Sequence, residues 1–293
     1  MKIVCIGGGH GLSRVLKALQ PLNTHLTAIV ATTDNGGSTG VIRDINNCVA
    51  LGDIRRCCLE LIDENALVRN IFDHRLSGGE LEGHSLGNLV LLGLLQVTNS
   101  ATEAVKQFNQ LLGNQVTIFP MSDQVTDLKA TLNTGREIYG ETAIDALNHF
   151  PKHVELTTKV SAPKGVVQSI LEADFVVIGP GSIISSVLPA LLVDDIAQAL
   201  EVTSATKVFI ENIQKEKSVA GSLSNDDLLA WLEEVIGFKF WDLSLTPEAL
   251  LELDLSSQED MEASPYHEVS SLNALFKDLL GTATIENLSD QTT

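Results

Sequence analysis

Four glycine-rich segments carry the residues of this chain whose types and spacing could do chemistry. They are residues 7–11 (Gly-Gly-Gly-His-Gly), 33–40 (Thr-Asp-Asn-Gly-Gly-Ser-Thr-Gly), 83–88 (Gly-His-Ser-Leu-Gly-Asn) and 179–182 (Gly-Pro-Gly-Ser), each beside an apolar run. Because glycine has no Cβ, such a segment can turn tightly and present peptide N–H groups to an anion at the start of a helix. Together the four segments predict a site that holds phosphate.

The first segment resembles a dinucleotide-binding fingerprint without matching it. The strict pattern G-x-G-x-x-G needs glycine or alanine where Leu12 stands, or glycine where Arg14 stands. A P-loop is excluded as well, since no Gly-Lys-Ser/Thr closes the turn. His10 and Arg14, one helical turn apart, could add charge to a bound phosphate, and Arg14 could equally form a surface ion pair. A plain tight turn is the alternative for the whole segment. The candidate binding residues are Gly7, Gly8, Gly9, His10 and Gly11.

The second segment offers a carboxylate and several hydrogen-bonding side chains. Asp34 stands where dinucleotide-binding folds place the carboxylate that holds a ribose hydroxyl. It could instead hold Mg²⁺ beside a phosphate, act as a catalytic base, or only form an Asx turn. The candidate binding residues are Asn35, Gly36, Gly37 and Ser38.

Arginines downstream of this segment could neutralise a bound phosphate. The motif Gly-Asp-Ile-Arg at 52–55 brings a second acid and Arg55 toward the same cleft, and we take Arg55 as a binding candidate. Arg43 and Arg56 could act in the same way. Surface ion pairs on helices are the competing explanation for each arginine.

The third segment begins a very apolar helix whose amino end would attract an anion. His84 could donate to a phosphate or act as a general acid. No carboxylate close in sequence would orient it, so a nucleophilic triad is unsupported. Ser85 or Asn88 could merely cap the helix. The candidate binding residues are His84, Ser85, Gly87 and Asn88.

The fourth segment repeats the geometry predicted for the first, because it follows an apolar strand and precedes a helix. In a doubly wound sheet, two such loops face each other where the strand order reverses, and a diphosphate could lie between them. Asn212, just past another predicted strand, is a candidate for a base or ribose contact. Asp194 and Asp195 look like a metal pair, but capping of the following helix is favoured. The candidate binding residues are Gly179, Gly181, Ser182 and Asn212.

The elements that must position these loops alternate between strand and helix. Residues 2–31 predict a strand, a helix and a second strand, which a right-handed crossover places side by side. The fold class is therefore α/β, a three-layer αβα, Rossmann-like, doubly wound and mostly parallel sheet. The predicted strands are residues 2–6, 26–31, 116–119, 175–178 and 207–210. Antiparallel pieces are expected near 126–132 and 137–139, joined by a hairpin turn at 133–135, and another edge strand at 154–158. The predicted helices are residues 12–19, 52–72, 87–96, 102–112, 164–172 and 225–236, with another from Ser182.

Length and composition favour a single domain over residues 1–293, with a helical insertion around 52–112 and an acidic C-terminal subdomain from about 242. The chain has 293 residues, 44% hydrophobic but only 4% aromatic, as suits a parallel sheet packed with aliphatic side chains. Its formal net charge of −19 repels polyanions, so nucleic acid is excluded as a partner.

Cysteine usage and hydropathy predict a cytoplasmic protein. Cys5, Cys48, Cys57 and Cys58 show no C-x-x-C spacing, which favours reduced thiols. No signal peptide precedes the first strand, and no apolar run reaches the roughly 20 residues that a membrane span needs.

The motifs taken together closely resemble the gluconeogenesis factor family. They are Gly-Gly-Gly-His-Gly-Leu at 7–12, Thr-Thr-Asp-Asn-Gly-Gly-Ser-Thr-Gly at 32–40, Gly-Asp-Ile-Arg at 52–55, Gly-His-Ser-Leu-Gly-Asn at 83–88 and Gly-Pro-Gly-Ser at 179–182. The family is similar in fold to 2-phospho-L-lactate transferase of the CofD type, which handles a guanine nucleotide with Mg²⁺. The resemblance implies a three-layer fold with a UDP-sugar pocket formed by the loops at 7–11, 34–38, 84–88 and 179–182. At 212–218 only Asn212 follows the family's pattern.

Two functions remain open from these residues. The resemblance implies a regulatory protein that binds a UDP-sugar and links carbon metabolism to cell-wall precursor supply and cell shape. The alternative is a Mg²⁺-dependent transferase that moves a phosphorylated group from a nucleoside diphosphate carrier, with GDP as the nucleotide and Asp34 as metal ligand or catalytic residue. The failed fingerprint weakens a nicotinamide dehydrogenase. Whether the chain forms a homo-oligomer stays open.

Overall fold

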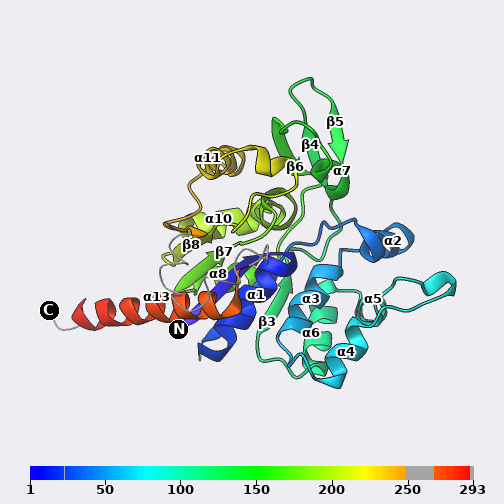
Figure 1. Cartoon of the computed structure of the whole chain (residues 1–293), viewed down its shortest axis with the longest axis horizontal. Helices are drawn as coiled ribbons and strands as arrows, with labels where there is room; N and C mark the ends of the chain where they lie inside the picture. Colours follow the sequence, from blue (N-terminus) through cyan, green and yellow to red (C-terminus); the bar gives the residue numbers. More distant parts are fainter. Residues whose placement is uncertain (23, 248–266, 291–293) are drawn as a thin grey trace.

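A six-stranded parallel sheet forms the centre of the structure, a computed structural model that describes residues 1–22, 24–247 and 267–290 (Figure 1). The strand order is β3-β2-β1-β7-β8-β9, and every neighbouring pair is parallel. Part of the acidic segment predicted from about residue 242 lies outside the described residues. The strands are β1 (Lys2–Gly7), β2 (His25–Val30), β3 (Thr117–Pro120), β7 (Phe175–Ile178), β8 (Thr206–Ile210) and β9 (Leu243–Leu245).

Both faces of this sheet are buried, which makes the fold a three-layer αβα. Along β1, Ile3 and Cys5 belong to one hydrophobic core, whereas Val4 and Ile6 belong to another. Because successive side chains of a strand point to opposite faces, the two cores lie on opposite sides of the sheet. The predicted α/β class with a doubly wound sheet is confirmed.

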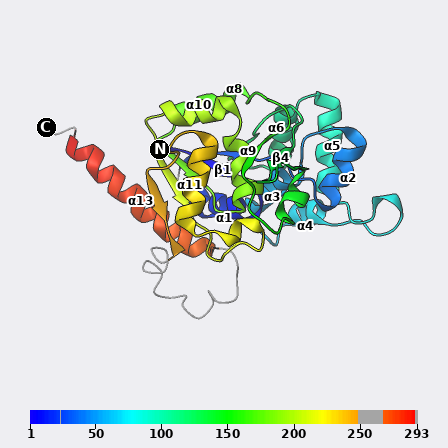
Figure 2. The same cartoon turned by 90° about the horizontal axis from the view of Figure 1, so that it is seen from above.

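Each core is covered by its own set of helices, and Figure 2 shows the same layers from above. The core that contains Ile3 is covered by α1 (Gly9–Leu19), α3 (Gly52–Glu60), α5 (Leu86–Thr98), α6 (Ala101–Leu111) and α13 (Val269–Asp290). The core that contains Val4 is covered by α8 (Lys164–Leu171), the π-helical turn Ile183–Val187, α9 (Leu188–Leu191), α10 (Asp194–Val202) and α11 (Asn225–Ile236).

The helices α3, α5 and α6 lie within the predicted helical block around 52–112, together with α4 (Leu67–Asp73) and a 3₁₀ turn at Gly79–Leu81. A further helix, α2 (Gly37–Asn46), begins within the second glycine-rich segment and lies outside the predicted block. The predicted helix over 52–72 is interrupted, because the Asp63 carboxylate accepts a hydrogen bond from the Asn65 amide at 2.8 Å and forms a turn. The loop between α4 and α5 projects from the body in both views (Figures 1 and 2). The division of the chain into one domain with this insertion stays a prediction.

A second, antiparallel sheet lies beyond β3 in the sequence, as predicted. Its order is β5-β4-β6, formed by β4 (Leu128–Thr131), β5 (Glu137–Tyr139) and β6 (His153–Leu156). The predicted hairpin turn is present, with Gly135 at a φ of +81° and its amide on the Leu132 carbonyl. A short helix, α7 (Glu141–Asp145), follows β5. The sequence does not predict it, and it brings two acids toward the main sheet.

Ser224 caps α11, because its Oγ accepts from the Asp227 amide at 3.2 Å. Other connections include 3₁₀ turns at Gln20–Leu22 and Val219–Ser222. Among the described residues no single helix is long and apolar enough to cross a membrane. One pair of consecutive helical segments reaches the required length and apolar composition only when the two are taken together, and the chain bends by 77° between them, at Ile183–Leu191 and Asp194–Val202.

Candidate functional site

The first and fourth glycine-rich loops touch each other at the carboxyl edge of the sheet. They follow the neighbouring strands β1 and β7, where the strand order reverses. A Cβ on Gly11 would lie 2.1 Å from the Pro180 carbonyl oxygen, so only glycine allows α1 to approach this loop. The structure therefore brings residues 7–11 and 179–182 together at the switch point.

Side-chain oxygens of the chain itself already accept hydrogen bonds from the amides of these loops. Asp53 Oδ2 accepts from the Gly9 amide at 2.7 Å, and Asp34 Oδ1 accepts from the Gly36 amide at 2.7 Å. Asn212 Oδ1 accepts from the Gly181 amide at 2.9 Å. A phosphate that uses any of these three amides must replace a side-chain oxygen.

Arg56 is the cation that faces the first loop. Its Nη1 donates to Asp53 Oδ1 at 2.7 Å and would lie 3.8 Å from a Cβ on Gly9. Burial, and next the charge of Arg56, lower the pKa of His10, which favours its neutral form. Arg14 donates instead to the His267 carbonyl at 3.0 Å, at the start of the C-terminal helical segment. Of the basic residues near the first loop, Arg56 offers the charge best placed for a phosphate.

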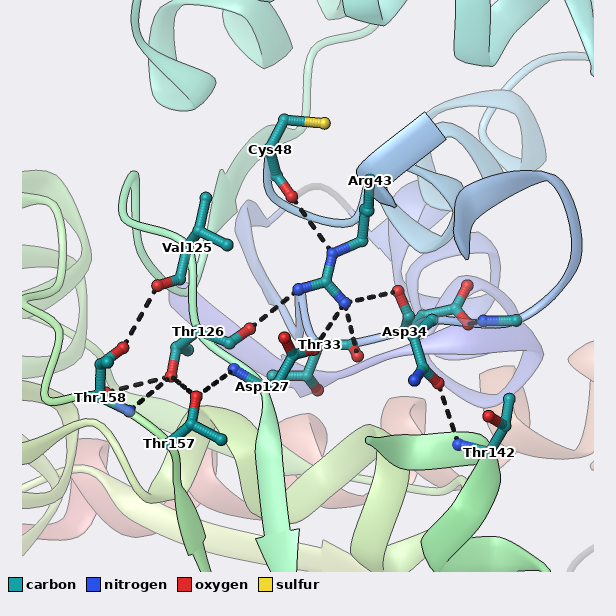
Figure 3. Close-up of polar contacts among 12 residues, drawn as sticks. Thr33, Asp34, Arg43, Cys48, Val125, Thr126, Asp127, Thr142, Thr157 and Thr158 are labelled. Atoms are coloured by element: carbon teal, nitrogen blue, oxygen red, sulfur yellow. Dashed lines mark hydrogen bonds and ion pairs between the residues drawn. The ribbon is translucent and has the colours of Figure 1, made fainter. Parts of the chain in front are cut away.

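Arg43 fixes the loop that carries Asp34 (Figure 3). Its guanidinium is buried and donates to the carbonyls of Thr33 and Asp34, both at 3.1 Å. The same group donates to the Asp127 carboxylate at 2.8 Å and to the Thr126 carbonyl at 3.0 Å. These two residues lead into the small antiparallel sheet. Arg43 thus positions the Asp34 loop from behind, with its hydrogen-bonding groups directed at the chain itself.

The second and third glycine-rich segments meet through side chains. Ser38 Oγ lies 2.8 Å from His84 Nδ1, and Asn88 Nδ2 donates to Ser38 Oγ at 3.4 Å. Ser85 caps α5, because its Oγ accepts from the Asn88 amide at 3.3 Å. The carbonyl oxygen of the buried Asn88 side chain has no partner among the described residues, so it remains able to accept from a ligand.

Arg55 is buried beneath the third segment. It forms an ion pair with Asp73 of α4, and a Cβ on Gly87 would lie 2.8 Å from its Cδ. Gly87 is therefore needed for packing against Arg55. The Nε of Arg55 lacks a partner in the described part of the chain. The structure thus places Arg55 against Gly87, and places Arg56 beside the first loop.

Acids from several elements lie at the same edge of the sheet, and the sequence did not predict two of them, Glu141 and Asp145. Burial, and next the charges of Asp34 and Asp53, raise the pKa of Glu141 to about 9. Burial, and next Glu216, raise the pKa of Asp145 to about 6. Burial also raises the pKa of Asp53, against the effect of Arg56. No motif identifies Glu141 or Asp145. The available signal is an acid directly after Gly140, at the start of a short helix.

A magnesium ion fits this edge only together with a ligand. No group of three or more His, Cys, Asp or Glu side chains is placed to hold a metal within the described residues. After burial, the charge of Asp34 is one of the effects that raise the pKa of Asp53, so the two carboxylates lie near each other. Because Mg²⁺ binds through one or two carboxylates plus phosphate oxygens, these two acids suit an ion that a nucleotide brings along. Asp194 and Asp195 lie in the first turn of α10, whose N-cap is Val193 without a side-chain cap, and Asp194 forms an ion pair with Lys159 at 3.0 Å.

A cavity of about 350 Å³ opens beside the first and fourth loops. Of the predicted site residues, Gly11, Gly181, Ser182 and Asn212 line it. The segment 212–218 forms one wall, and Asp145 and Arg14 face it from other elements. The residues predicted at 34–38 and 84–88 do not line this cavity. They form a separate polar cluster, which lies close to Asp53 because a Cβ on the neighbouring Gly52 would lie 3.5 Å from Asp34 Oδ2.

The chain is similar along nearly its whole length to proteins of one family. The family profile described as 2-phospho-L-lactate transferase CofD matches residues 3–284. A gluconeogenesis factor of Listeria innocua is 33% identical over 287 residues, which are 96% of this chain and 89% of the relative. A relative in Pasteurella multocida that provisionally carries the same name is 38% identical over 289 residues, 96% of this chain and 94% of its own length.

The fold is shared with a solved structure of similar sequence. The crystal structure of protein BH3568 from Bacillus halodurans superposes with a TM-score of 0.80 at 33% identity. The superposition covers 84% of this chain and 79% of that one. The same three-layer arrangement thus occurs in a relative.

Proposed function

Since the chain belongs to the gluconeogenesis factor family, within the wider group described by 2-phospho-L-lactate transferase CofD, we propose that it is a cytoplasmic regulatory protein that binds a UDP-sugar. The observation that supports this function is the contact between the loops at 7–11 and 179–182 at the switch point of a parallel sheet. Open α/β sheets bind nucleotides at this place. Binding of the UDP-sugar would signal the supply of cell-wall precursors. This signal would link carbon metabolism to that supply and to cell shape.

The diphosphate of the ligand would lie between the first loop and the fourth loop. The amino end of α1 favours negative charge there, and Arg56 adds a positive charge. The diphosphate would replace the Asp53 oxygen on the Gly9 amide. The adjoining cavity would take the sugar or the base, next to Ser182 and Asp145, each of which has a side-chain oxygen without a partner in the described structure.

The crowded carboxylates favour a second candidate, the Mg²⁺-dependent transfer of a phosphorylated group. A Mg²⁺ ion, when bound, would neutralise phosphate charge. Asp34 and Asp53 would hold it, while Glu141, protonated at neutral pH, could donate a hydrogen bond or a proton to a phosphate oxygen. The match to the transferase profile supports this candidate as well.

Calorimetry separates the two candidates. UDP-N-acetylglucosamine and GDP are titrated into the protein with and without Mg²⁺, and the ligand is recovered and analysed afterwards. The regulatory function predicts Mg²⁺-independent binding of UDP-N-acetylglucosamine, which is recovered intact. Binding that requires Mg²⁺ and is followed by loss of the nucleotide would instead establish the transferase. The absence of heat with either nucleotide would reject both.

The Gly9→Val variant tests the loop assignment. A valine side chain would occupy the place of the phosphate, so we expect binding of UDP-N-acetylglucosamine to be lost. Gly9 has a φ of +61°, so valine also strains the backbone and lowers stability. Gly113→Val is the matched control, because Gly113 has a φ of +72° and no atom within 4 Å of an added Cβ. Equal affinity in Gly9→Val and Gly113→Val would contradict the assignment.

A further inference from the structure

The segment 212–218, which follows β8, is hydrogen-bonded onto the fourth glycine-rich loop. Asn212 makes a reciprocal pair with Gly181, accepting from its amide at 2.9 Å and donating to its carbonyl at 2.8 Å. The segment forms a wall of the cavity of about 350 Å³ described above. It therefore controls one side of the proposed ligand site.

Glu216 ties this segment to the start of the next helix. Its Oε1 accepts from the Ile183 amide at 2.9 Å and lies 3.3 Å from Asn212 Nδ2. Its Oε2 accepts from Ser218 Oγ at 2.9 Å. Ile183 begins the helix Ile183–Leu191, whose amino end favours a negative group. The Glu216 carboxylate thus occupies the same kind of amide that a phosphate would use.

The backbone on either side keeps Glu216 in this place. A Cβ on Gly221 would lie 2.0 Å from the Glu216 carbonyl oxygen, so the chain can close onto Glu216 only with glycine there. The charge of Glu216 also bears on Asp145 across the cavity. The exposed residues Lys215 and Lys217 flank the carboxylate in the sequence. Moving Glu216 outward would separate two like charges and leave an amide for an incoming anion.

We propose that the segment 212–218 is an autoinhibitory element, in which the Glu216 carboxylate competes with the phosphates of a nucleoside diphosphate for the Ile183 amide, while Asn212 of the same segment holds the Gly181 amide. This inference rests on the proposed function, because it concerns the same site. Ligand binding replaces Glu216 and releases the segment, and the lysines on either side of it are then able to approach the phosphates. The affinity of the wild-type chain includes the cost of breaking the Glu216 contacts.

Removing the carboxylate should therefore strengthen binding. We expect Glu216→Ala to bind UDP-N-acetylglucosamine about tenfold more tightly than wild type, the effect of removing a competing charged hydrogen bond. Glu216→Gln keeps an acceptor without the charge, so its gain should be smaller. Glu201→Ala is the control, because Glu201 is exposed on α10 and its removal changes the net charge equally. A gain in Glu201→Ala equal to that in Glu216→Ala would overturn the proposal.

A second variant and a ligand-free readout separate this inference from the proposed function. Gly221→Ala displaces the Glu216 backbone without altering charge, so it too should bind more tightly. Without ligand, hydrogen exchange of the Ile183 amide should be faster in Glu216→Ala than in wild type. If wild type binds the nucleotide and Glu216→Ala binds no better, the inference fails and the proposed function stands. If neither wild type nor any variant binds the nucleotide, the proposed function fails. The proposed competition then fails as well, even if hydrogen exchange shows the contact between Glu216 and the Ile183 amide.

Discussion

The acids at the edge of the sheet act first on the chain's own backbone. Asp53, Asp34 and Glu216 each accept a hydrogen bond from a loop amide that an anion could use. The glycine-rich pattern identifies two of these amides, those of Gly9 and Gly36. It gives no indication that Asp53 and Glu216 already accept from backbone amides there, since each of these acids lies on a different element. The Asp34 contact is the Asx turn that the sequence offered as one alternative.

At the scale of the single residue, we predict that the free energy of unfolding depends on Arg43. Arg43→Ala would leave buried carbonyls of the Thr33–Asp34 loop and of Thr126 without a donor. We expect a loss of about 3 kcal/mol in the free energy of unfolding, measured by urea denaturation. Arg136→Ala, at an exposed position in the hairpin, should change it by no more than about 0.5 kcal/mol. Similar losses in the two variants would contradict the structural role of Arg43.

We predict that Glu141 makes the stability of the folded protein depend on pH. Its pKa is about 9 in the folded chain, against an ordinary value of 4.5, so between these pH values the folded state binds the additional proton. Stability from this group is therefore complete below about pH 4.5 and decreases as pH rises toward about 9. We expect the Glu141→Gln substitution to remove this pH-dependent decrease in stability, because glutamine does not ionise.

The measurement compares unfolding free energies of wild type and Glu141→Gln at several pH values. We expect the wild-type curve to fall more steeply, by up to about 1.4 kcal/mol per pH unit. Glu234→Gln, on the exposed face of α11, should follow the wild-type curve. Parallel curves for wild type and Glu141→Gln would show that the folded state does not hold this proton.

At the scale of elements, close approach of α1 to the 179–182 loop decides the geometry of the switch point. Strand and helix periodicity predicts both elements, and the parallel pairing of β1 with β7 places their loops together. Periodicity does not predict α7, because five residues are too few for a periodic signal. The acids Glu141 and Asp145 were missed for this reason.

Two glycine-to-alanine substitutions in helices test the close approach. Gly11→Ala places a Cβ 2.1 Å from the Pro180 carbonyl, so α1 or the loop must move and stability should fall. Gly93→Ala in α5 has no atom within 4 Å of the added Cβ and should raise stability by up to about 1 kcal/mol, by helix propensity alone. Thermal unfolding of both variants provides the comparison. Stabilisation of both would show that the loops are not in contact.

At the scale of the whole molecule, all four thiols are buried, and those of Cys5, Cys57 and Cys58 lie in the core that contains Ile3. Cys5, Cys48, Cys57 and Cys58 are free and buried, and burial raises the pKa of each. We expect no reaction of the folded protein with Ellman's reagent at pH 8, and reaction of four thiols after denaturation. Rapid labelling of one thiol in the folded protein would place that cysteine at the surface.

The sequence by itself determined the αβα class, the positions of most strands and the four loops that follow or flank them. These features depend on local patterns, because strand and helix periodicity and glycine-rich turns are properties of short segments. The resemblance to the gluconeogenesis factor family came from the same loops, since their motifs are long and occur in a fixed order.

Only the tertiary structure decided which partners these loops have. It placed Arg56 rather than Arg55 beside the first loop, assigned Arg43 to the support of the Asp34 loop, and brought Glu141 and Glu216 to the site. Such contacts join residues that are far apart in the sequence. Their geometry depends on how helices pack against the sheet, and no local pattern in the amino-acid sequence encodes that packing.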